Sequence, residues 1–252
     1  IAESRCKTDR IDARILADLL RIGYLPEVYQ PSARCRSWRQ LVSEHRALMS
    51  DQVRFCCRAR MLLSREGVLV QATDCFGKKG RASIAAAALS LQTRRQINRL
   101  IKLYDNLNEE MLEVDTQIER VAAGDRIASL LMTIDGIGAL TALALRAHIG
   151  DIRRFGSPKA LAAYSGLIPS LRQSAETVHH GHITRQGPSV LRWLLIQAVP
   201  HAVRTTPYLR RLYSRLCYRT SVAAAKVAVA HALIRIVWHV WTEARPYYRV
   251  AS

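Results

Sequence analysis

The sequence predicts a mainly α-helical protein. Apolar residues follow helical spacing from Ile11 to Ile22, and heptad spacing is sustained from Ile97 to Val121. Between residues 132 and 142 one helix ends, two glycines follow, and a second helix begins at once. The chain has 252 residues, which is enough to bury a real core in one large or two modest domains.

The charge is the outlier in an otherwise ordinary globular composition. The chain holds 38 Lys and Arg against 20 Asp and Glu, a net charge of +18. Residues 126–252 hold 17 basic and four acidic residues, and 15 of the 17 are arginine. Because the planar fork of arginine suits bidentate contact with phosphate, we expect a nucleic acid as partner and the C-terminal half as its main binding surface.

The first predicted helix covers residues 9–23 and carries two carboxylates at its start. Asp9 and Asp12 are three residues apart, so they lie on one face, where they can share a hard divalent cation through oxygen ligands. The alternative is a purely structural role, in which one aspartate caps the helix and the other adds a favourable charge to its first turn. The spacing alone leaves both open.

The next predicted elements are two long helices. Residues 33–69 form a basic helix whose cationic side is either a solvated face or a nucleic-acid face. Residues 74–80 read as a turn, and residues 94–121 carry the a/d heptad pattern of a coiled coil. The heptad helix can pair with residues 33–69 or with another subunit. Ala122 to Asp125 break the helix and mark the predicted domain boundary.

The glycine hairpin contains Gly136 and Gly138 and is followed directly by a helix. Glycines allow positive φ and close backbone approach, and the helix that follows directs free N–H groups and its positive dipole end outward. The functional interpretation is a helix-hairpin-helix that binds a nucleic-acid backbone. The structural alternative is an ordinary tight corner between two helices.

Two histidine-containing stretches do not indicate a metal or a membrane. His179, His180 and His182 fit no helical ligand pair, and the six cysteines show no Cys-x-x-Cys spacing, so a loop that touches phosphate is favoured over zinc. The apolar run 222–241 is long enough to span a membrane. However, Lys226 and Arg235 share one stripe with two histidines, which favours packing against a core, with a basic face toward nucleic acid or a membrane surface, over a membrane span.

The order of short motifs in the C-terminal half is specific. Along the chain come Gly-Asp-Ile-Arg-Arg-Phe, Tyr-Ser-Gly-Leu-Ile-Pro, Gln173-Ser174, Thr-Arg-Gln-Gly and Leu191-Arg192. This order resembles the C-terminal domain of the bacterial DEDD transposases of insertion-sequence family one-ten, the RNA-guided bridge recombinases. Residues 7–13 resemble the end of the RuvC-like nuclease domain of that family. The resemblance covers nearly the whole chain.

The resemblance implies three parts. Residues 1–30 end a RuvC-like, RNase H-like domain, residues 31–125 form a helical coiled-coil linker, and residues 126–252 form a helical transposase domain with the helix-hairpin-helix. It implies a DNA transposase or recombinase that excises and integrates an insertion sequence by strand exchange. The expected setting is the bacterial cytoplasm at the nucleoid, with DNA and a structured guide RNA as partners and a homo-oligomer formed through the coiled coil.

The resemblance also assigns roles to residues. Asp9 and Asp12 match the last two of four acidic Mg²⁺ ligands, and Ser174 matches the serine that forms a covalent bond to DNA. Ala175 departs from the family, which usually has glycine there, and Ser165 and Ser170 are the other candidate hydroxyls. The DNA backbone is expected to contact Gly136, Gly138, Arg185, Arg192, Lys226 and Arg235.

Since only two of the four acidic positions are matched, we expect the chain to lack an N-terminal part and to be inactive alone. The rival hypothesis is a non-catalytic remnant of such a transposase that only binds nucleic acid.

Overall fold

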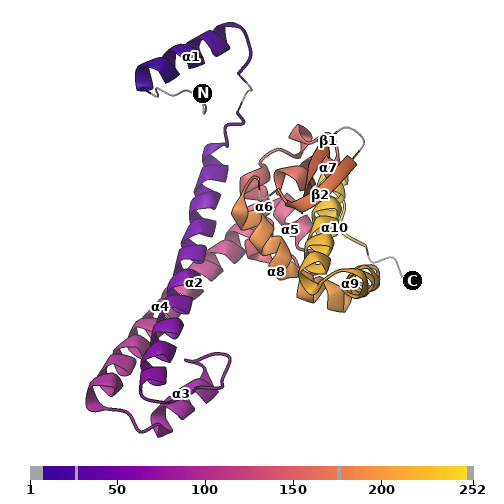
Figure 1. The fold of residues 1–252 in the computed structure, drawn as a ribbon. Coiled ribbons are helices and arrows are strands. Elements are labelled where there is room, and N and C mark those ends of the chain that lie inside the picture. The colour runs from indigo at the N-terminus through magenta and orange to yellow at the C-terminus, as the bar shows by residue number, and fades with distance from the viewer. Residues whose placement is uncertain (1–7, 26–27, 175–176, 185, 249–252) are drawn as a thin grey trace.

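The structure is a computed structural model that describes residues 8–25, 28–174, 177–184 and 186–248. The prediction of a mainly helical fold is confirmed: the described residues form ten α-helices, one short 3₁₀ helix and one two-stranded sheet. Figure 1 shows a separate first helix, a long two-helix arm and a bundle of shorter helices beside one end of the arm.

The first helix, α1 (Asp9–Arg21), begins after Thr8, whose hydroxyl accepts a hydrogen bond from the amide of Ile11 at 3.4 Å. None of its residues is buried, and it projects away from the bundle. The linker that follows is anchored by Tyr29, because the guanidinium of Arg154 lies 3.6 Å from the centre of its ring.

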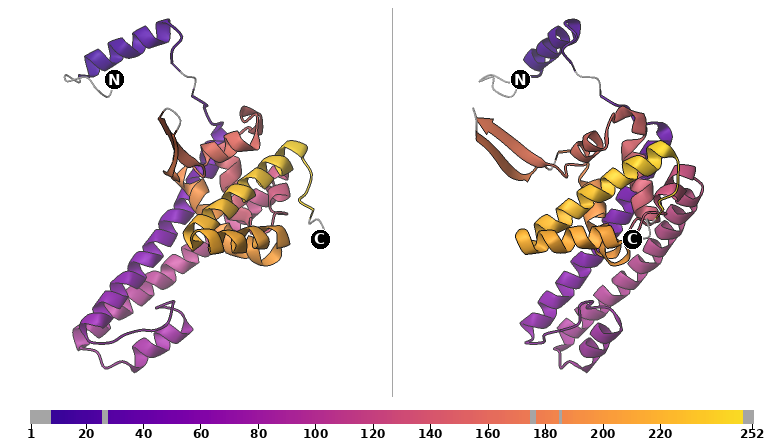
Figure 2. Two further views of the ribbon diagram at one scale, coloured as in Figure 1. Left: turned by 45° about the vertical axis from the view of Figure 1, so that its right-hand side comes forward. Right: turned by 90° about the vertical axis from the view of Figure 1, so that its right-hand side faces the viewer.

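The arm consists of α2 (Ala33–Arg65) and α4 (Leu91–Ala123), which run side by side in opposite directions (Figure 2). At its far end they are joined through α3 (Lys78–Ala86). The basic helix predicted for residues 33–69 is therefore present and ends slightly earlier. The turn predicted for residues 74–80 is shorter, because Gly77 already starts α3 and Lys78 lies in its first turn.

The heptad face of α4 packs against α2 of the same chain. Its end positions Ile97, Leu100, Val114 and Ile118 are buried, and its middle positions are half-buried. Of the two pairings that the sequence allows, the structure therefore has the intrachain one.

Two cores hold the fold. A small one lies at the far end of the arm and includes Leu63, Phe76 and Ile97. The large one joins Trp38 of α2 and Ile118 of α4 to the helices of the bundle. Because the large core contains residues from both sides of position 125, the arm and the bundle are fixed to one another. The domain boundary at Asp125 stays a prediction.

The bundle contains α5 (Arg126–Leu131), α6 (Ala139–Ile149), the 3₁₀ helix η1 (Ile152–Arg154), α7 (Pro158–Tyr164), α8 (Ser189–Thr205), α9 (Pro207–Arg219) and α10 (Val222–Glu243). Seven of the 11 residues of α6 are buried, and α6 packs against α5, α8 and both helices of the arm, whereas α10 packs against α5, η1, α7, α8 and α9. The helix α10 is long and apolar enough to cross a membrane by length and composition. One of its faces is buried in the large core.

A β-hairpin, not expected from the sequence, replaces part of the loop-rich segment predicted before α8. Its strands are β1 (Pro169–Ser174) and β2 (Thr177–Ile183), which pair antiparallel with an irregularity between Pro169 and Leu171. Three helices, α8, α9 and α10, follow it. The hairpin projects from the bundle in the side view of Figure 2.

The pairing of α4 with α2 can be tested at Leu107 and Met111, which are half-buried heptad positions. Replacing both by glutamate buries charge between the helices, so we expect the free energy of unfolding to fall by about 2 kcal/mol or more. The control is Leu112→Glu, because 68% of Leu112 is exposed. Equal thermal stability of the double variant and the wild type would contradict the heptad packing.

Candidate active site and nucleic-acid interface

Asp9 and Asp12 lie in the first turn of α1, as predicted. Asp9 is exposed, whereas one carboxylate oxygen of Asp12 is buried and has no hydrogen-bond partner among the described residues. A buried, unpaired carboxylate oxygen is costly unless a cation or a donor meets it, so this pair fits half of a divalent-metal site. The described residues contain no group of three His, Cys, Asp or Glu that could hold a metal by itself.

Ser174 is the last residue of β1 and pairs with Thr177 across the end of the hairpin. The backbone around it is therefore fixed by the ladder up to the turn, and Gln173 pairs with Val178. The side chain of Ser174 lies outside the described part of the structure, as do Ala175 and Arg185. The role of Ser174 stays a prediction, but its position at the tip of a projecting hairpin is compatible with access to a large substrate.

The other two candidate serines are placed differently. Ser165 is fully buried, and its hydroxyl donates a hydrogen bond to the carbonyl oxygen of Leu161 at 3.0 Å. Ser170 is half-buried, and its hydroxyl oxygen fills the space beside Gly181 on β2, 2.4 Å from where a Cβ would lie. Ser165 is thus tied into α7 and closed to solvent, which favours a structural role for it.

The glycine turn contains one packing glycine and one helix cap. Gly136 has a φ of +89°, and a Cβ there would lie 2.6 Å from the carbonyl oxygen of Ala198 on α8. This close approach gives Gly136 a structural reason to be glycine. Gly138 is exposed and precedes α6 as its N-cap, with no side-chain cap among the described residues. Phosphate binding by Gly136 and Gly138 stays a prediction, and the open end of α6 at Gly138 favours it there.

Arg192 lies near the start of α8, and one of its guanidinium nitrogens, Nη1, is buried without a hydrogen-bond partner among the described residues. The hydroxyl oxygen of Thr184, which lies before α8 in the chain, is also buried and has no hydrogen-bond partner among the described residues. Buried polar atoms are normally satisfied, so each of these two groups is a candidate donor to an acceptor such as a phosphate oxygen.

Lys226, His231 and Arg235 lie along α10, as the predicted stripe requires. Burial, and then the charge of Arg235, lower the pKa of His231, so this imidazole is neutral at pH 7 and the positive charge of the stripe rests on Lys226 and Arg235. His231 and Arg235 line a groove of about 830 Å³ between the base of the hairpin, α9 and α10. The groove therefore lies directly beside the strand that carries Ser174.

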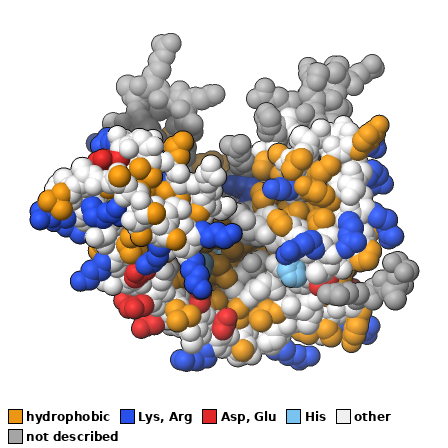
Figure 3. Space-filling model, turned by 90° about the horizontal axis from the view of Figure 1, so that it is seen from below, with side chains coloured by type: hydrophobic (Ala, Val, Ile, Leu, Met, Phe, Trp, Pro, Cys, Tyr) orange, Lys and Arg blue, Asp and Glu red, His pale blue; other side chains and the backbone are white. Residues whose placement is uncertain are grey.

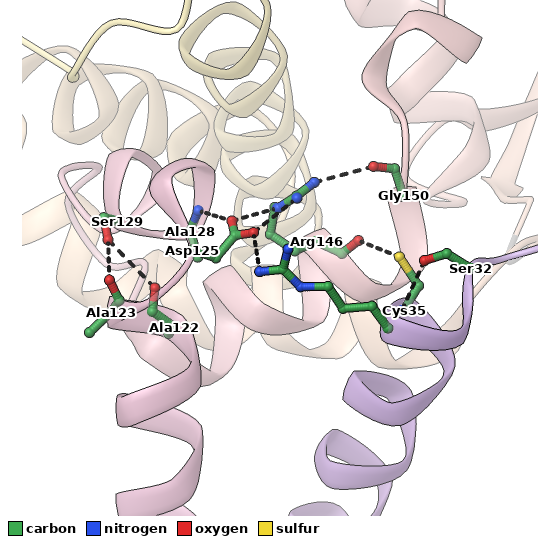
Figure 4. Close-up of polar contacts among 10 residues, drawn as sticks. Ser32, Cys35, Ala122, Ala123, Asp125, Ala128, Ser129, Arg146 and Gly150 are labelled. Carbon is green, nitrogen blue, oxygen red and sulfur yellow. Dashed lines mark hydrogen bonds and ion pairs between the residues drawn. The ribbon is translucent and has the colours of Figure 1, made fainter.

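The arm is locked to the bundle by a buried ion pair that the sequence analysis missed. Asp125 is 5% exposed, and its carboxylate accepts hydrogen bonds from Nε and Nη2 of Arg146 at 2.8 and 3.0 Å and from the amide of Ala128 at 2.8 Å (Figure 4). Arg34 of α2 adds a longer contact of 3.2 Å from its more exposed side chain. The same Arg146 lies 4.7 Å from the ring centre of Trp241 on α10. One residue of α6 thereby connects the arm, α5 and α10.

The structure does not bring the predicted site residues together in one place. Arg192 of α8 and Arg235 of α10 belong to the bundle, whereas α1 and the hairpin project separately from it (Figure 2). Within the described residues, the predicted acidic residues on α1 and the predicted cationic residues of the bundle therefore lie on separate parts of the fold, and their roles stay predictions.

Comparison with known proteins gives two family matches. The transposase family described as IS116/IS110/IS902 matches residues 128–214, and a transposase family of the DEDD type, named after IS110, matches residues 1–66. Together the two matches cover more than half of the chain. The first contains the hairpin and α8, and the second contains α1 with its two carboxylates.

Curated relatives agree with these matches. A protein of Pseudomonas aeruginosa named as a family 20 transposase is 25% identical over 249 residues, which cover 92% of this chain and 72% of the relative. The transposase for insertion sequence element IS1111A of Coxiella burnetii is 25% identical over 248 residues, 96% of this chain and 68% of the relative. The transposase for IS1328 of Yersinia enterocolitica is 29% identical over 153 residues, 59% of this chain and 46% of the relative.

Proposed function

We propose that this chain, which belongs to the IS116/IS110/IS902 family of transposases, takes part in the excision and integration of an insertion sequence by DNA strand exchange. The observation that carries the proposal is the presence of both family parts in one chain: α1 with its carboxylate pair, and the bundle with the hairpin. The net charge of +13 over residues 126–252 supports DNA as the substrate.

In the proposed reaction Ser174 is the nucleophile. Its hydroxyl oxygen attacks a phosphorus of the DNA backbone, a new phosphorus–oxygen bond forms, and the bond to the leaving strand breaks while that strand keeps the bonding electrons and takes up a proton. The enzyme is then linked to one DNA end through a phosphoserine. A hydroxyl in the second strand reverses the step and joins the ends, so no external energy source is needed.

The residues around the hairpin would hold the DNA for this step. Arg192 and Thr184 offer buried donors that have no partner among the described residues, Arg235 adds positive charge to the neighbouring groove, and Lys226 adds it elsewhere on α10. Because such donors are fixed before the substrate arrives, they stabilise charge that develops on the phosphate without further reorganisation. Arg185 and the amide of Gly138 would extend the same contact to neighbouring phosphates.

Asp9 and Asp12 would hold a divalent metal, and we propose Mg²⁺, together with acidic groups from outside the described residues. The metal would supply a Lewis acid that stabilises phosphate charge. The orphan oxygen of Asp12 is the observation that supports a cation here. A structured RNA that selects the target is the further partner that the family resemblance suggests.

We further propose that copies of the chain associate through the outer side of the arm. The heptad face of α4 is already covered by α2, so an oligomer would use the apolar residues that stay exposed, such as Val53 and Leu112, of which 58% and 68% are exposed.

The DNA-binding part of the proposal predicts a strong salt dependence. If six to ten phosphates are contacted, the affinity for duplex DNA should fall by about 10³-fold or more between 50 and 200 mM salt. Fluorescence anisotropy with a labelled duplex would measure this, with an uncharged peptide nucleic acid duplex as control. An equal dissociation constant at both salt concentrations would contradict the proposal.

A further inference from the structure

The far end of the arm is strongly cationic, although the N-terminal half as a whole is not. We define the arm tip as residues 55–108, which hold ten Lys and Arg against three Asp and Glu. The other residues of 1–125 hold 11 Lys and Arg against 13 Asp and Glu. The small net charge of this half therefore conceals an arm tip with a net charge of +7. Figure 3 shows Lys and Arg on the arm as well as on the bundle, with the face hollowed between them. Most of the tip lies outside both family matches.

The three carboxylates of the arm tip are all engaged within it. Glu66 accepts hydrogen bonds from the hydroxyls of Ser90 and Thr93, both at 2.6 Å, and these bonds lower its pKa. Asp74 accepts a hydrogen bond from a backbone amide two residues on, at 3.0 Å. Asp105 pairs with Arg81, whose Nη1 lies 3.0 Å from its carboxylate. Only one of the ten basic side chains is therefore neutralised by a carboxylate of the tip.

Two further arginines donate hydrogen bonds to backbone carbonyl oxygens. Arg60 donates to the carbonyl oxygen of Ala72 at 3.0 Å and holds the loop after α2, and Arg94 donates to that of Ile84 at 2.7 Å at the end of α3. Together with Arg81, these arginines have a structural role. These three arginines stabilise the fold of the arm tip. The other basic residues of the tip have no such structural role in the described contacts.

Three of the remaining arginines meet at one groove. Arg58 and Arg65 of α2 and Arg99 of α4 line a groove of about 440 Å³ whose floor includes Met61 and Leu103. No acidic residue lines the groove, and none of the three arginines has a hydrogen-bond or ionic partner within the described residues. All three are exposed. Three uncompensated guanidinium groups on a rigid helix pair repel one another, and a bound polyanion would relieve this repulsion.

We propose that this groove is a second DNA-binding site, in which Arg58, Arg65 and Arg99 hold the phosphate backbone of duplex DNA. The proposal rests on the proposed function, which supplies the duplex. Arg58 and Arg65 are seven residues apart on one face of α2, which corresponds to about 10.5 Å along the helix, so they reach phosphates separated by more than one nucleotide. The apolar floor supports the aliphatic stems of the arginines while their charged ends face outward. The site would contact DNA away from the hairpin, without reading bases.

The test is the salt dependence of DNA binding by the triple variant Arg58→Gln, Arg65→Gln, Arg99→Gln of the full chain. Each lost phosphate contact removes about 0.9 from the slope of log affinity against log salt, so we expect the slope to become less steep by about 2.7. The control variant Arg14→Gln, Arg54→Gln, Arg120→Gln loses the same charge at exposed positions outside the groove. Its slope should equal that of the wild type. Circular dichroism and melting temperature establish that both variants are folded.

Three results would overturn the proposal. The first is a wild-type slope in the groove variant, which would leave DNA binding and the proposed function intact. The second is an equal loss of slope in both variants, because this would report net charge alone. The third is a loss with a folded RNA of the same length but none with duplex DNA, which would make the groove an RNA site. By contrast, a wild-type chain that binds no duplex at any salt would contradict the proposed function itself.

Discussion

Replacing Asp125 by alanine is expected to lower the free energy of unfolding by about 3–5 kcal/mol, because the change leaves the largely buried guanidinium of Arg146 without its charge partner. The side chain of Arg146 is 15% exposed and that of Asp125 is 5% exposed, so water cannot replace the lost contact. Arg34→Ala is the matched control. Its side chain is 62% exposed, and its removal should cost about 1 kcal/mol or less. Urea unfolding measures both, and equal losses in the two variants would contradict the central position of Asp125.

The same ion pair predicts a pH dependence. Burial alone would raise the pKa of Asp125, but hydrogen bonds from Arg146 and from the amide of Ala128 outweigh it and hold the pKa below its ordinary value. A carboxylate with a lowered pKa contributes stability that is fully present above the unfolded pKa of about 3.9 and is lost as the pH falls through the folded pKa. Below pH 4 the stability of the wild type should therefore fall more steeply than that of Asp125→Asn. Parallel curves would contradict this assignment.

Ser174→Ala is expected to reduce strand exchange by about three orders of magnitude or more, since in the proposed reaction the hydroxyl of Ser174 forms the covalent bond to DNA. The assay uses the protein with the proposed RNA partner, magnesium and a supercoiled plasmid that carries the insertion sequence. Ser165→Ala is the first control: its hydroxyl is buried and bonded to Leu161, so the variant should keep its activity and lose about 1 kcal/mol of stability. Ser170→Ala is the second control and should also remain active.

A different pattern of loss would reassign the nucleophile. Full activity in Ser174→Ala with loss in Ser170→Ala would place the reaction at Ser170. Full activity in all three variants would exclude a serine of this segment from the reaction.

The helices were predictable because their signals are local. The heptad spacing of α4 and the apolar run of α10 each lie within one element, and both helices occur where the sequence places them. The choice of partner for α4 was not predictable, since a heptad stripe is equally suited to a helix of the same chain and to another subunit. The ends of α4 are buried because the connection through α3 places α4 beside α2, and this connection is not visible in the heptad pattern.

The hairpin was missed for a physical reason. Its strands, Pro169–Ser174 and Thr177–Ile183, are rich in polar residues and histidines and lack the apolar alternation of a half-buried sheet. A projecting two-stranded sheet does not need an apolar face along its length, so it leaves no periodic signal. The motif that contains Ser174 was recognisable, but its placement on a strand was not.

The Asp125–Arg146 pair and the arm tip also have no local signature. The pair joins residues 21 positions apart, and sequence alone suggests only a helix cap for Asp125 and a solvated charge for Arg146. The positive charge of the arm tip is not apparent from the sequence when charge is counted over residues 1–125 as a whole. Only the structure separates arginines bonded within the tip, such as Arg60, from those such as Arg58 that have no partner among the described residues.

The central claim is a covalent step at Ser174, and the most direct measurement is to identify the residue that becomes linked to DNA. The protein would be incubated with the proposed RNA partner, magnesium and a nicked duplex that traps the intermediate. Nuclease digestion, proteolysis and mass spectrometry would then locate the nucleotide adduct. We predict a phosphoserine-linked nucleotide on the peptide that contains Ser174. An adduct on any other residue, or strand exchange that proceeds while no adduct forms, would contradict the proposed mechanism.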